Sequence, residues 1–220
     1  MHNTVQNLIT IENKIKSNLI DLKINNLPKI IAVSKTFKMD KILPLIDHGH
    51  LDFGENKIQE ALDKWTLMKK EFPNIKLHMI GKLQTNKVKF LLPLFDYFHA
   101  LDNLKLAKKI AEQEKKSQKK LKIFIQINLK NEDQKNGVDI NYLKEFYLIC
   151  VKELNLDIVG LMCLPPNDEN TNIYFSEVQK LNKELNLPEL SLGMSQDYLN
   201  AIKYGSTFLR IGSKIFGNRI

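Results

Sequence analysis

The sequence contains few of the residues that mark secreted, metal-binding and membrane proteins. Only two of its 220 residues are cysteines. Two cysteines cannot build the disulfide framework of a small secreted domain, and Cys150 and Cys163 do not have the spacing of metal ligands. No apolar run reaches about 18 residues, which excludes a membrane span, and the polar N-terminus is unlike a signal peptide. We therefore expect a cytoplasmic protein with reduced cysteines and no membrane partner.

Linkers are absent as well. No Gly/Ser-rich or Pro-rich stretch divides the chain, and there is no long low-complexity tract. Hydrophobic residues make up 43% of the sequence and charged residues 26%, which is ordinary for a globular protein and excludes a disordered one. A chain of this length can bury a large core. The sequence therefore predicts a single domain over residues 1–220.

Basic residues are in excess, and they are concentrated in one segment. The net charge is +8, and residues 105–122 alone hold eight lysines and two glutamates, a net charge of +6. A nucleic-acid interface would use arginine and stacking aromatic residues, and this segment contains neither. A solvated helix face is the favoured interpretation. A basic nucleic-acid-binding protein is kept as an alternative.

Short apolar, β-branched runs alternate with longer helical patterns along the chain. Strands are predicted over residues 30–34, 51–53, 76–80, 96–100, 122–128, 157–162, 190–192 and 207–211. Helices are predicted over residues 3–20, 40–47, 56–72, 85–92, 103–116, 140–154, 170–185 and 196–203. Strands separated by helices favour parallel pairing and an α/β fold, a (β/α)8 TIM barrel with a leading N-terminal helix. A doubly wound open sheet is the alternative if the two shortest strands are absent.

Barrels of this type carry their active site at the carboxyl ends of the strands, so the residues that follow each strand are the candidates. Lys35 ends the first predicted strand. Inside the barrel mouth its amine would be partly desolvated, which lowers the pKa of a lysine and leaves a free amine able to form a Schiff base. The alternative is a lysine whose charged end reaches solvent at the rim.

Two small polar clusters follow the last two strands, where barrels often bind phosphate. Ser195 is expected to begin a helix, Gly212 allows the backbone to approach an anion, and Ser213 can donate its hydroxyl. Ser195 could equally be only a helix N-cap. Arg210 alternates with apolar neighbours, so it faces either the barrel interior or the helix layer. The neighbouring phosphate cluster favours the interior.

Other motifs carry less chemistry. His48 and His50 form an H-x-H pair without a third ligand nearby, so no metal site is predicted. Met194, like Met79 and Met162, is interpreted as packing in a wall or core rather than as part of a cofactor motif.

Ordered motifs span nearly the whole chain. They are Ile31-Ala32-Val33-Ser34-Lys35-Thr36, Asp52-Phe53-Gly54-Glu55-Asn56, His78-Met79-Ile80-Gly81, Gly160-Leu161-Met162, Leu192-Gly193-Met194-Ser195-Gln196-Asp197 and Arg210-Ile211-Gly212-Ser213-Lys214. Together they resemble the pyridoxal phosphate homeostasis protein family (the YggS/PROSC family). Lys82 departs from the family, which usually has histidine there. The resemblance implies a fold like the N-terminal domain of bacterial alanine racemases.

The resemblance also implies a covalent cofactor, pyridoxal 5′-phosphate (PLP). The residues that would hold it are Lys35 (Schiff base), Ser195, Gly212 and Ser213 (phosphate), Arg210 (pyridine nitrogen), Asn56 (beside the ring), and His78 and Met194 (pocket lining).

An arginine opposite the pyridine nitrogen has a chemical consequence. A carboxylate there keeps the nitrogen protonated and makes the ring a strong electron sink, which an always-charged arginine cannot do. Alanine racemase compensates with a second acid/base from an added β domain, which we do not expect in a chain that ends at Ile220. The sequence therefore predicts a monomeric carrier or buffer in intracellular PLP (vitamin B6) homeostasis, with PLP-dependent apo-enzymes as partners and no catalytic residues. The alternative is a low-activity racemase-like enzyme that uses His78 as the second acid/base.

Overall fold

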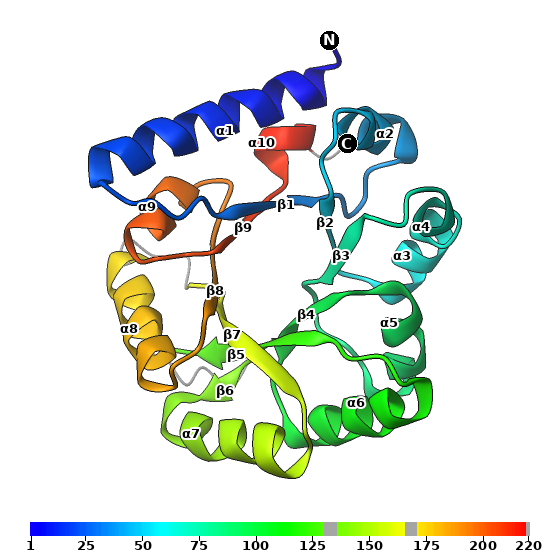
Figure 1. Ribbon diagram of the computed structural model, residues 1–220, viewed down its shortest axis with the longest axis vertical. Coiled ribbons are helices and arrows are strands. Elements are labelled where there is room, and N and C mark those ends of the chain that lie inside the picture. The colour runs from blue at the N-terminus through cyan, green and yellow to red at the C-terminus, as the bar shows by residue number, and fades with distance from the viewer. Residues whose placement is uncertain (130–135, 166–170, 219–220) are drawn as a thin grey trace.

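Eight parallel strands close into a barrel around a central axis (Figure 1). A computed structural model of the chain describes residues 1–129, 136–165 and 171–218. The barrel strands within these residues are β1 (Lys29–Val33), β2 (Asp52–Glu55), β3 (Lys76–Met79), β4 (Tyr97–Leu101), β5 (Lys122–Asn128), β7 (Asp157–Cys163), β8 (Glu189–Met194) and β9 (Phe208–Ile211). A two-residue strand, β6 (Val138–Asp139), pairs with the end of β5.

Each barrel strand pairs in parallel with the next one along the chain, and β9 returns to β1 with Ile30 opposite Leu209. The pairing of β4 with β5 closes the ring, because the eight long strands would otherwise form an open sheet from β4 to β5, with the two-residue β6 beyond β5. The (β/α)8 barrel prediction is therefore confirmed, and the doubly wound alternative is wrong. The two short strands on which that choice depended are both present, as β2 and β8.

Helices surround the barrel (Figure 1). They are α1 (Asn3–Leu22), α2 (Met39–Asp47), α3 (Ile58–Trp65), α4 (Met68–Glu71), α5 (Val88–Leu94), α6 (Leu104–Ser117), α7 (Ile140–Leu148), α8 (Thr171–Glu184), α9 (Tyr198–Lys203) and α10 (Ser213–Phe216). A short 3-10 turn (Thr85–Lys87) precedes α5, and a π-helical turn (Ile149–Glu153) continues α7. The leading helix α1 packs against α2, α9 and α10, and the Asn7 amide donates to the Ile215 carbonyl at 2.9 Å.

Several element predictions need correction. The helix expected over residues 56–72 is two helices, α3 and α4, and the Thr66 hydroxyl bonds back to the Leu62 carbonyl where α3 ends. The helix expected to stop before Pro93 continues to Leu94. The short elements β6 and α10 were missed because two or four residues show no periodicity. Two predicted features, the loop at Pro166 and the helix start at Asn170, lie outside the described residues.

Aromatic and imidazole rings fill the barrel interior. Phe208 lies at its centre, with ring centroids 5.4 Å from Tyr97, 5.6 Å from His78, 5.8 Å from His99 and 5.5 Å from Phe124. His78 stacks on Tyr97 at 4.4 Å, and His99 stacks on Phe124 at 4.2 Å. The barrel is therefore a packed core, and space for a ligand is left at its ends.

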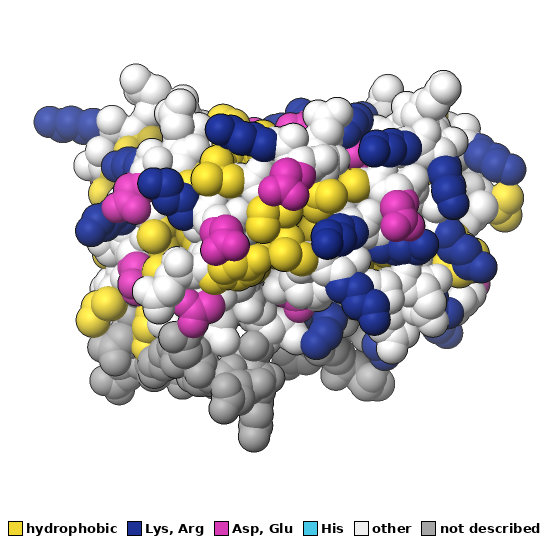
Figure 2. Space-filling view, turned by 90° about the horizontal axis from the view of Figure 1, so that it is seen from below, with side chains coloured by type: hydrophobic (Ala, Val, Ile, Leu, Met, Phe, Trp, Pro, Cys, Tyr) yellow, Lys and Arg dark blue, Asp and Glu magenta, His cyan; other side chains and the backbone are white. Residues whose placement is uncertain are grey.

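The charge and hydropathy of the surface bear on nucleic-acid binding and on membrane insertion. Seven of the eight lysines between residues 105 and 122 are exposed, which agrees with a solvated helix face on and after α6. Figure 2 views the α6 and α7 side and shows basic side chains spread over it with acidic ones among them. In the part of the chain that the structure describes, none of the helices is long and apolar enough to cross a membrane.

Candidate functional site

A pocket of about 940 Å³ opens at the carboxyl ends of the strands. It brings together seven of the eight residues singled out in the sequence, which are Lys35, Asn56, Met194, Ser195, Arg210, Gly212 and Ser213. These residues come from the ends of β1, β2, β8 and β9, which are distant in the chain but adjacent around the barrel. The expectation that the strand ends converge on one site is thus met by the fold.

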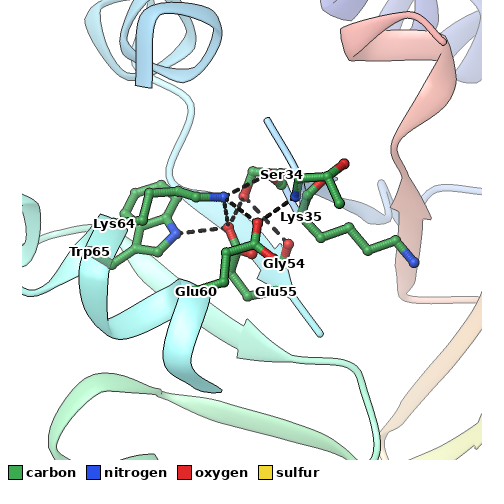
Figure 3. Close-up of polar contacts among 8 residues, drawn as sticks. Ser34, Lys35, Gly54, Glu55, Glu60, Lys64 and Trp65 are labelled. Atoms are coloured by element: carbon green, nitrogen blue, oxygen red, sulfur yellow. Dashed lines mark hydrogen bonds and ion pairs between the residues drawn. The ribbon is translucent and has the colours of Figure 1, made fainter. Parts of the chain in front are cut away.

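A buried carboxylate anchors the end of β1, next to Lys35 (Figure 3). Glu55 is fully buried, and its Oε1 accepts hydrogen bonds from the Ser34 hydroxyl at 2.8 Å and the Trp65 indole N–H at 2.9 Å. The Lys64 ammonium lies 2.9 Å from the same oxygen. Oε1 is thus paired and hydrogen-bonded, as a buried charge requires, whereas Oε2 is buried without a hydrogen-bond partner among the described residues.

The same ammonium ties this carboxylate to the residue after Lys35. Lys64 donates to the Ser34 carbonyl at 2.9 Å and to Glu60 at 3.0 Å, and Glu60 accepts the N–H of Thr36. Thr36 has a φ of 70°, a left-handed conformation that a β-branched residue rarely adopts. Its neighbours hold it in that conformation, and Figure 3 shows the Lys35 side chain directed away from the network. Because Lys35 lines the pocket and is half-buried, this turn aims its amine at the ligand space.

Asn56 presents an unsatisfied oxygen at the pocket. Its Oδ1 is buried and has no hydrogen-bond partner among the described residues. Asn56 is held in place by a close backbone approach, because a Cβ on Gly81 would lie 2.3 Å from the Asn56 carbonyl oxygen. An orphaned buried acceptor of this kind indicates a ligand or water partner.

Backbone amides and hydroxyls gather where β8 and β9 end. The Ser195 hydroxyl accepts from the N–H groups of Gly212 at 3.2 Å and Lys214 at 3.4 Å, at the start of α10. Gly193, with a φ of 85°, lies near the end of β8 at an irregularity in its pairing with β9, and a Cβ there would lie 2.7 Å from that of Ala201. The prediction that Ser195 begins a helix is wrong, because residues 195–197 form a turn and α9 begins at Tyr198. Ser195 instead caps α10 across the site.

Arg210 points into the barrel interior, as the sequence analysis favoured, and not into the helix layer. It is buried, lines the pocket, and donates to the Ser191 carbonyl at 2.6 Å, the Ser191 hydroxyl at 2.7 Å and the Cys163 carbonyl at 2.8 Å. Burial lowers the pKa of Arg210 to about 10, so the guanidinium stays charged at neutral pH. All three acceptors are uncharged oxygens, so no carboxylate among them neutralises the positive charge that Arg210 presents to the pocket.

His78 is the one predicted site residue that the structure does not place at the pocket. It lies inside β3, and its ring points to the amino-terminal end of the barrel, where Nε2 is 2.9 Å from Asp52 Oδ1. The third motif reaches the pocket through Ile80 and Gly81, which follow the strand. The expectation that His78 lines the pocket is therefore corrected: the pleat and the Asp52 carboxylate direct its ring into the core.

Two other chemistries find no support in the described residues. No group of three or more His, Cys, Asp or Glu side chains there is arranged to hold a metal ion. Burial raises the pKa of both cysteine thiols to about 12, so neither Cys150 nor Cys163 is a nucleophile near neutral pH.

The chain is similar to known proteins over nearly its whole length. Residues 12–219 match the family "Alanine racemase, N-terminal domain". A pyridoxal phosphate homeostasis protein of Aquifex aeolicus is 36% identical over 88% of this chain and 88% of its own length. The protein of the same name from Buchnera aphidicola is 36% identical over 100% of both chains.

A solved structure shares the fold. PipY of Synechococcus elongatus PCC7942, determined with PLP bound, superposes with a TM-score of 0.81 and 28% identity, over 92% of this chain and 100% of PipY. These similarities point to the same family as the ordered sequence motifs, several of which meet at the pocket. The chain belongs to the pyridoxal phosphate homeostasis protein family, within the alanine racemase N-terminal domain family.

Proposed function

We propose that this chain binds PLP as a Schiff base on Lys35 and acts as a carrier or buffer in intracellular PLP homeostasis. The observation that carries the proposal is the grouping of an amine, an anion cradle and a guanidinium in one pocket of about 940 Å³. The names of the relatives and the PLP bound to PipY support the same ligand.

The residues present fit PLP. Lys35 would hold the aldehyde carbon through a C=N bond, a condensation that releases one water and requires an unprotonated amine. The phosphate would take the amides of Gly212 and Lys214, which the Ser195 hydroxyl now caps, together with the Ser213 hydroxyl. The orphaned Oδ1 of Asn56 would gain a partner beside the ring. Arg210 would donate to the pyridine nitrogen.

The chemistry of the pocket favours a carrier over an enzyme. Bound PLP supplies an electron sink for amino-acid chemistry, and that sink is strong when a carboxylate keeps the pyridine nitrogen protonated. Arg210 cannot protonate the nitrogen, and it donates to hydroxyl and carbonyl oxygens. The racemase-like alternative needed His78 as an acid/base, and that ring lies in the barrel core. The only carboxylate among the described pocket-lining residues is that of Asp197. It is occupied by a hydrogen bond from the Met194 N–H at 2.6 Å.

An absorbance spectrum with added PLP tests the site. The wild-type protein should show a band at about 420 nm, the absorbance of the Schiff-base chromophore, and borohydride should fix it. Lys35→Ala should lose the band, whereas Lys38→Ala, which removes an exposed lysine three residues away, should keep it. A wild-type protein that takes up no PLP would overturn the assignment.

Amino-acid turnover tests the carrier role. The PLP-loaded protein should exchange the α-proton of added amino acids for deuterium slowly, or not at all. Rapid, stereospecific exchange would refute the carrier role and restore the racemase-like alternative, without affecting the assignment of Lys35. The monomeric state, the cytoplasmic location and the apo-enzyme partners expected from the sequence stay predictions.

A further inference from the structure

Five side chains form one hydrogen-bonded line through the barrel interior, from its amino-terminal end to the pocket. They are Asp52, His78, His99, Ser191 and Arg210, and together they are called the axial line below. Successive links measure 2.9 Å from Asp52 Oδ1 to His78 Nε2, 3.0 Å from His78 Nδ1 to His99 Nε2, 3.0 Å from His99 Nδ1 to Ser191 Oγ, and 2.7 Å from Ser191 Oγ to Arg210 Nη1. Of the five, Arg210 alone lines the ligand pocket.

The Arg210 end determines where each proton lies. A guanidinium only donates, so the Ser191 hydroxyl accepts from Arg210. The neighbour of that hydroxyl on its other side is His99 Nδ1, so the hydroxyl hydrogen is donated there. His99 is then neutral with its proton on Nε2, which it donates to His78 Nδ1. His78 in turn carries its proton on Nε2.

The Asp52 end leads to the same arrangement independently. A carboxylate only accepts, so His78 Nε2 must donate to Asp52. Burial lowers the pKa of both His78 and His99, which keeps the two rings neutral near pH 7. The pKa of His78 falls although the hydrogen bond to Asp52 opposes burial. Both ends therefore require neutral rings with the proton on Nε2, and the line has one polarity along its whole length.

Solvent reaches the line at its far end. Asp52 is partly exposed and lines a second pocket of about 310 Å³ at the amino-terminal end of the barrel, with His50 and Lys29. Other titratable and charged groups lie around the axial line. They are Lys29, His50, Asp96, Tyr97, Lys122, Cys163 and Asp197. A proton that enters from this end meets Asp52 and His78 first.

We propose that the axial line helps to position Arg210 for the ligand pocket, and that His99 acts through the Ser191 hydroxyl, the one acceptor of Arg210 that is not a backbone carbonyl. Protonation of His78 places a hydrogen on Nδ1, and His99 must then move its own proton from Nε2 to Nδ1. Ser191 would receive two donors, from His99 and Arg210, and its hydroxyl hydrogen would lose its acceptor. This reversal weakens the hydrogen bond from Arg210 to the Ser191 hydroxyl. Acid at the amino-terminal end of the barrel therefore weakens the proposed PLP site at the carboxyl-terminal end.

Nitrogen NMR of ¹⁵N-histidine-labelled protein without PLP tests the polarity directly. The five histidines can be assigned by single substitutions. His78 and His99 should both be neutral with the proton on Nε2 at pH 7. On acidification, the His99 proton should move to Nδ1 at the same pH at which His78 becomes protonated. A His99 protonated on Nδ1 at pH 7, or a His78 titration that leaves His99 unchanged, would overturn the proposal.

PLP binding tests the positioning role, and this arm rests on the proposed function. His99→Phe keeps a flat ring on Phe124 but breaks the line, and should weaken PLP binding about tenfold. His99→Gln keeps one donor and one acceptor on a flat amide, and should restore binding to within about threefold of wild type. Equal affinities for His99→Phe and wild type would refute the positioning role. A wild-type protein that binds no PLP would overturn the proposed function instead, and the NMR result would decide the line by itself.

Discussion

Lys64 is the residue on which the charge balance beside the proposed PLP lysine depends. Its ammonium is 2.9 Å from the fully buried Glu55 and 3.0 Å from Glu60. Only 9% of the Lys64 side chain is exposed, so the pair with Glu55 is shielded from solvent. Removing one partner of a buried pair is far more costly than the pair is stabilising, because the other charge is left without compensation.

Lys64→Met should therefore lower the free energy of unfolding by about 3–5 kcal/mol. Lys109→Met is the matched control: Lys109 pairs with Glu112 at 2.8 Å on the exposed face of α6, where ion pairs contribute little. Urea denaturation of both variants measures the difference. Equal, small losses for the two lysines would show that solvent compensates Glu55.

The turns after β2 and β3 shape the pocket at the scale of elements. These parallel strands are neighbours, and Gly81 brings the chain after β3 against the backbone of Asn56. A methyl group at Gly81 would lie 2.3 Å from the Asn56 carbonyl oxygen, and backbone cannot move aside as a flexible side chain can. The segments that follow β2 and β3 can therefore approach this closely only because residue 81 is a glycine and has no Cβ.

Gly81→Ala should weaken PLP binding about tenfold or more, because the added methyl group pushes Asn56 from the pocket wall, and should cost about 1–3 kcal/mol of stability. Gly49→Ala is the control. Gly49 has a φ of 94°, and no atom beyond its two chain neighbours lies within 4 Å of the position that a Cβ would take, so its substitution strains the backbone away from the ligand pocket. It should lower stability and leave PLP affinity unchanged. Unchanged PLP binding by Gly81→Ala would show that the close approach is only structural.

The whole molecule should become less stable in acid. Burial lowers the pKa of His50, His78 and His99 below the ordinary value of about 6.5. The unfolded chain therefore binds protons below about pH 6.5 that the native protein does not bind, so stability is present above that pH and is lost as the pH falls. Burial raises the pKa of Asp52, but the hydrogen bond from His78 and the nearby basic groups His78, His50 and Lys29 together outweigh burial and lower the pKa, which extends the loss to lower pH.

Urea denaturation between pH 7 and pH 5 measures this loss. Each histidine that stays neutral in the native protein contributes a slope that approaches about 1.4 kcal/mol per pH unit below about pH 6.5. His99→Phe should reduce the slope, because burial holds the pKa of His99 well below its ordinary value, whereas His48→Gln, at an exposed position, should leave the slope as it is. A free energy of unfolding that is constant over this range would refute the assignment of buried neutral rings.

Local sequence patterns predicted the barrel and most of the pocket. The apolar run 122–128 is β5 with the same bounds, since seven consecutive residues rich in β-branched and aromatic side chains leave little choice of structure. Lys35, Arg210, Gly212 and Ser213 were identifiable because each lies at or just after a strand end, and parallel strands in a barrel all end on one face. Two of the missed elements were short, and the assignment of Ser195 to a helix start failed by three residues.

The sequence by itself determined which residues end strands, and therefore which side chains can meet at the pocket. Only the tertiary structure decided which way His78 points, that Lys64 and Trp65 share the Glu55 carboxylate, and that His99 reaches Ser191, 92 positions away in the chain. The physical reason is that a strand's local pattern depends on its near neighbours, whereas a buried polar side chain takes its direction from the partner that satisfies it. That partner is identified only when the closed barrel brings distant strands together.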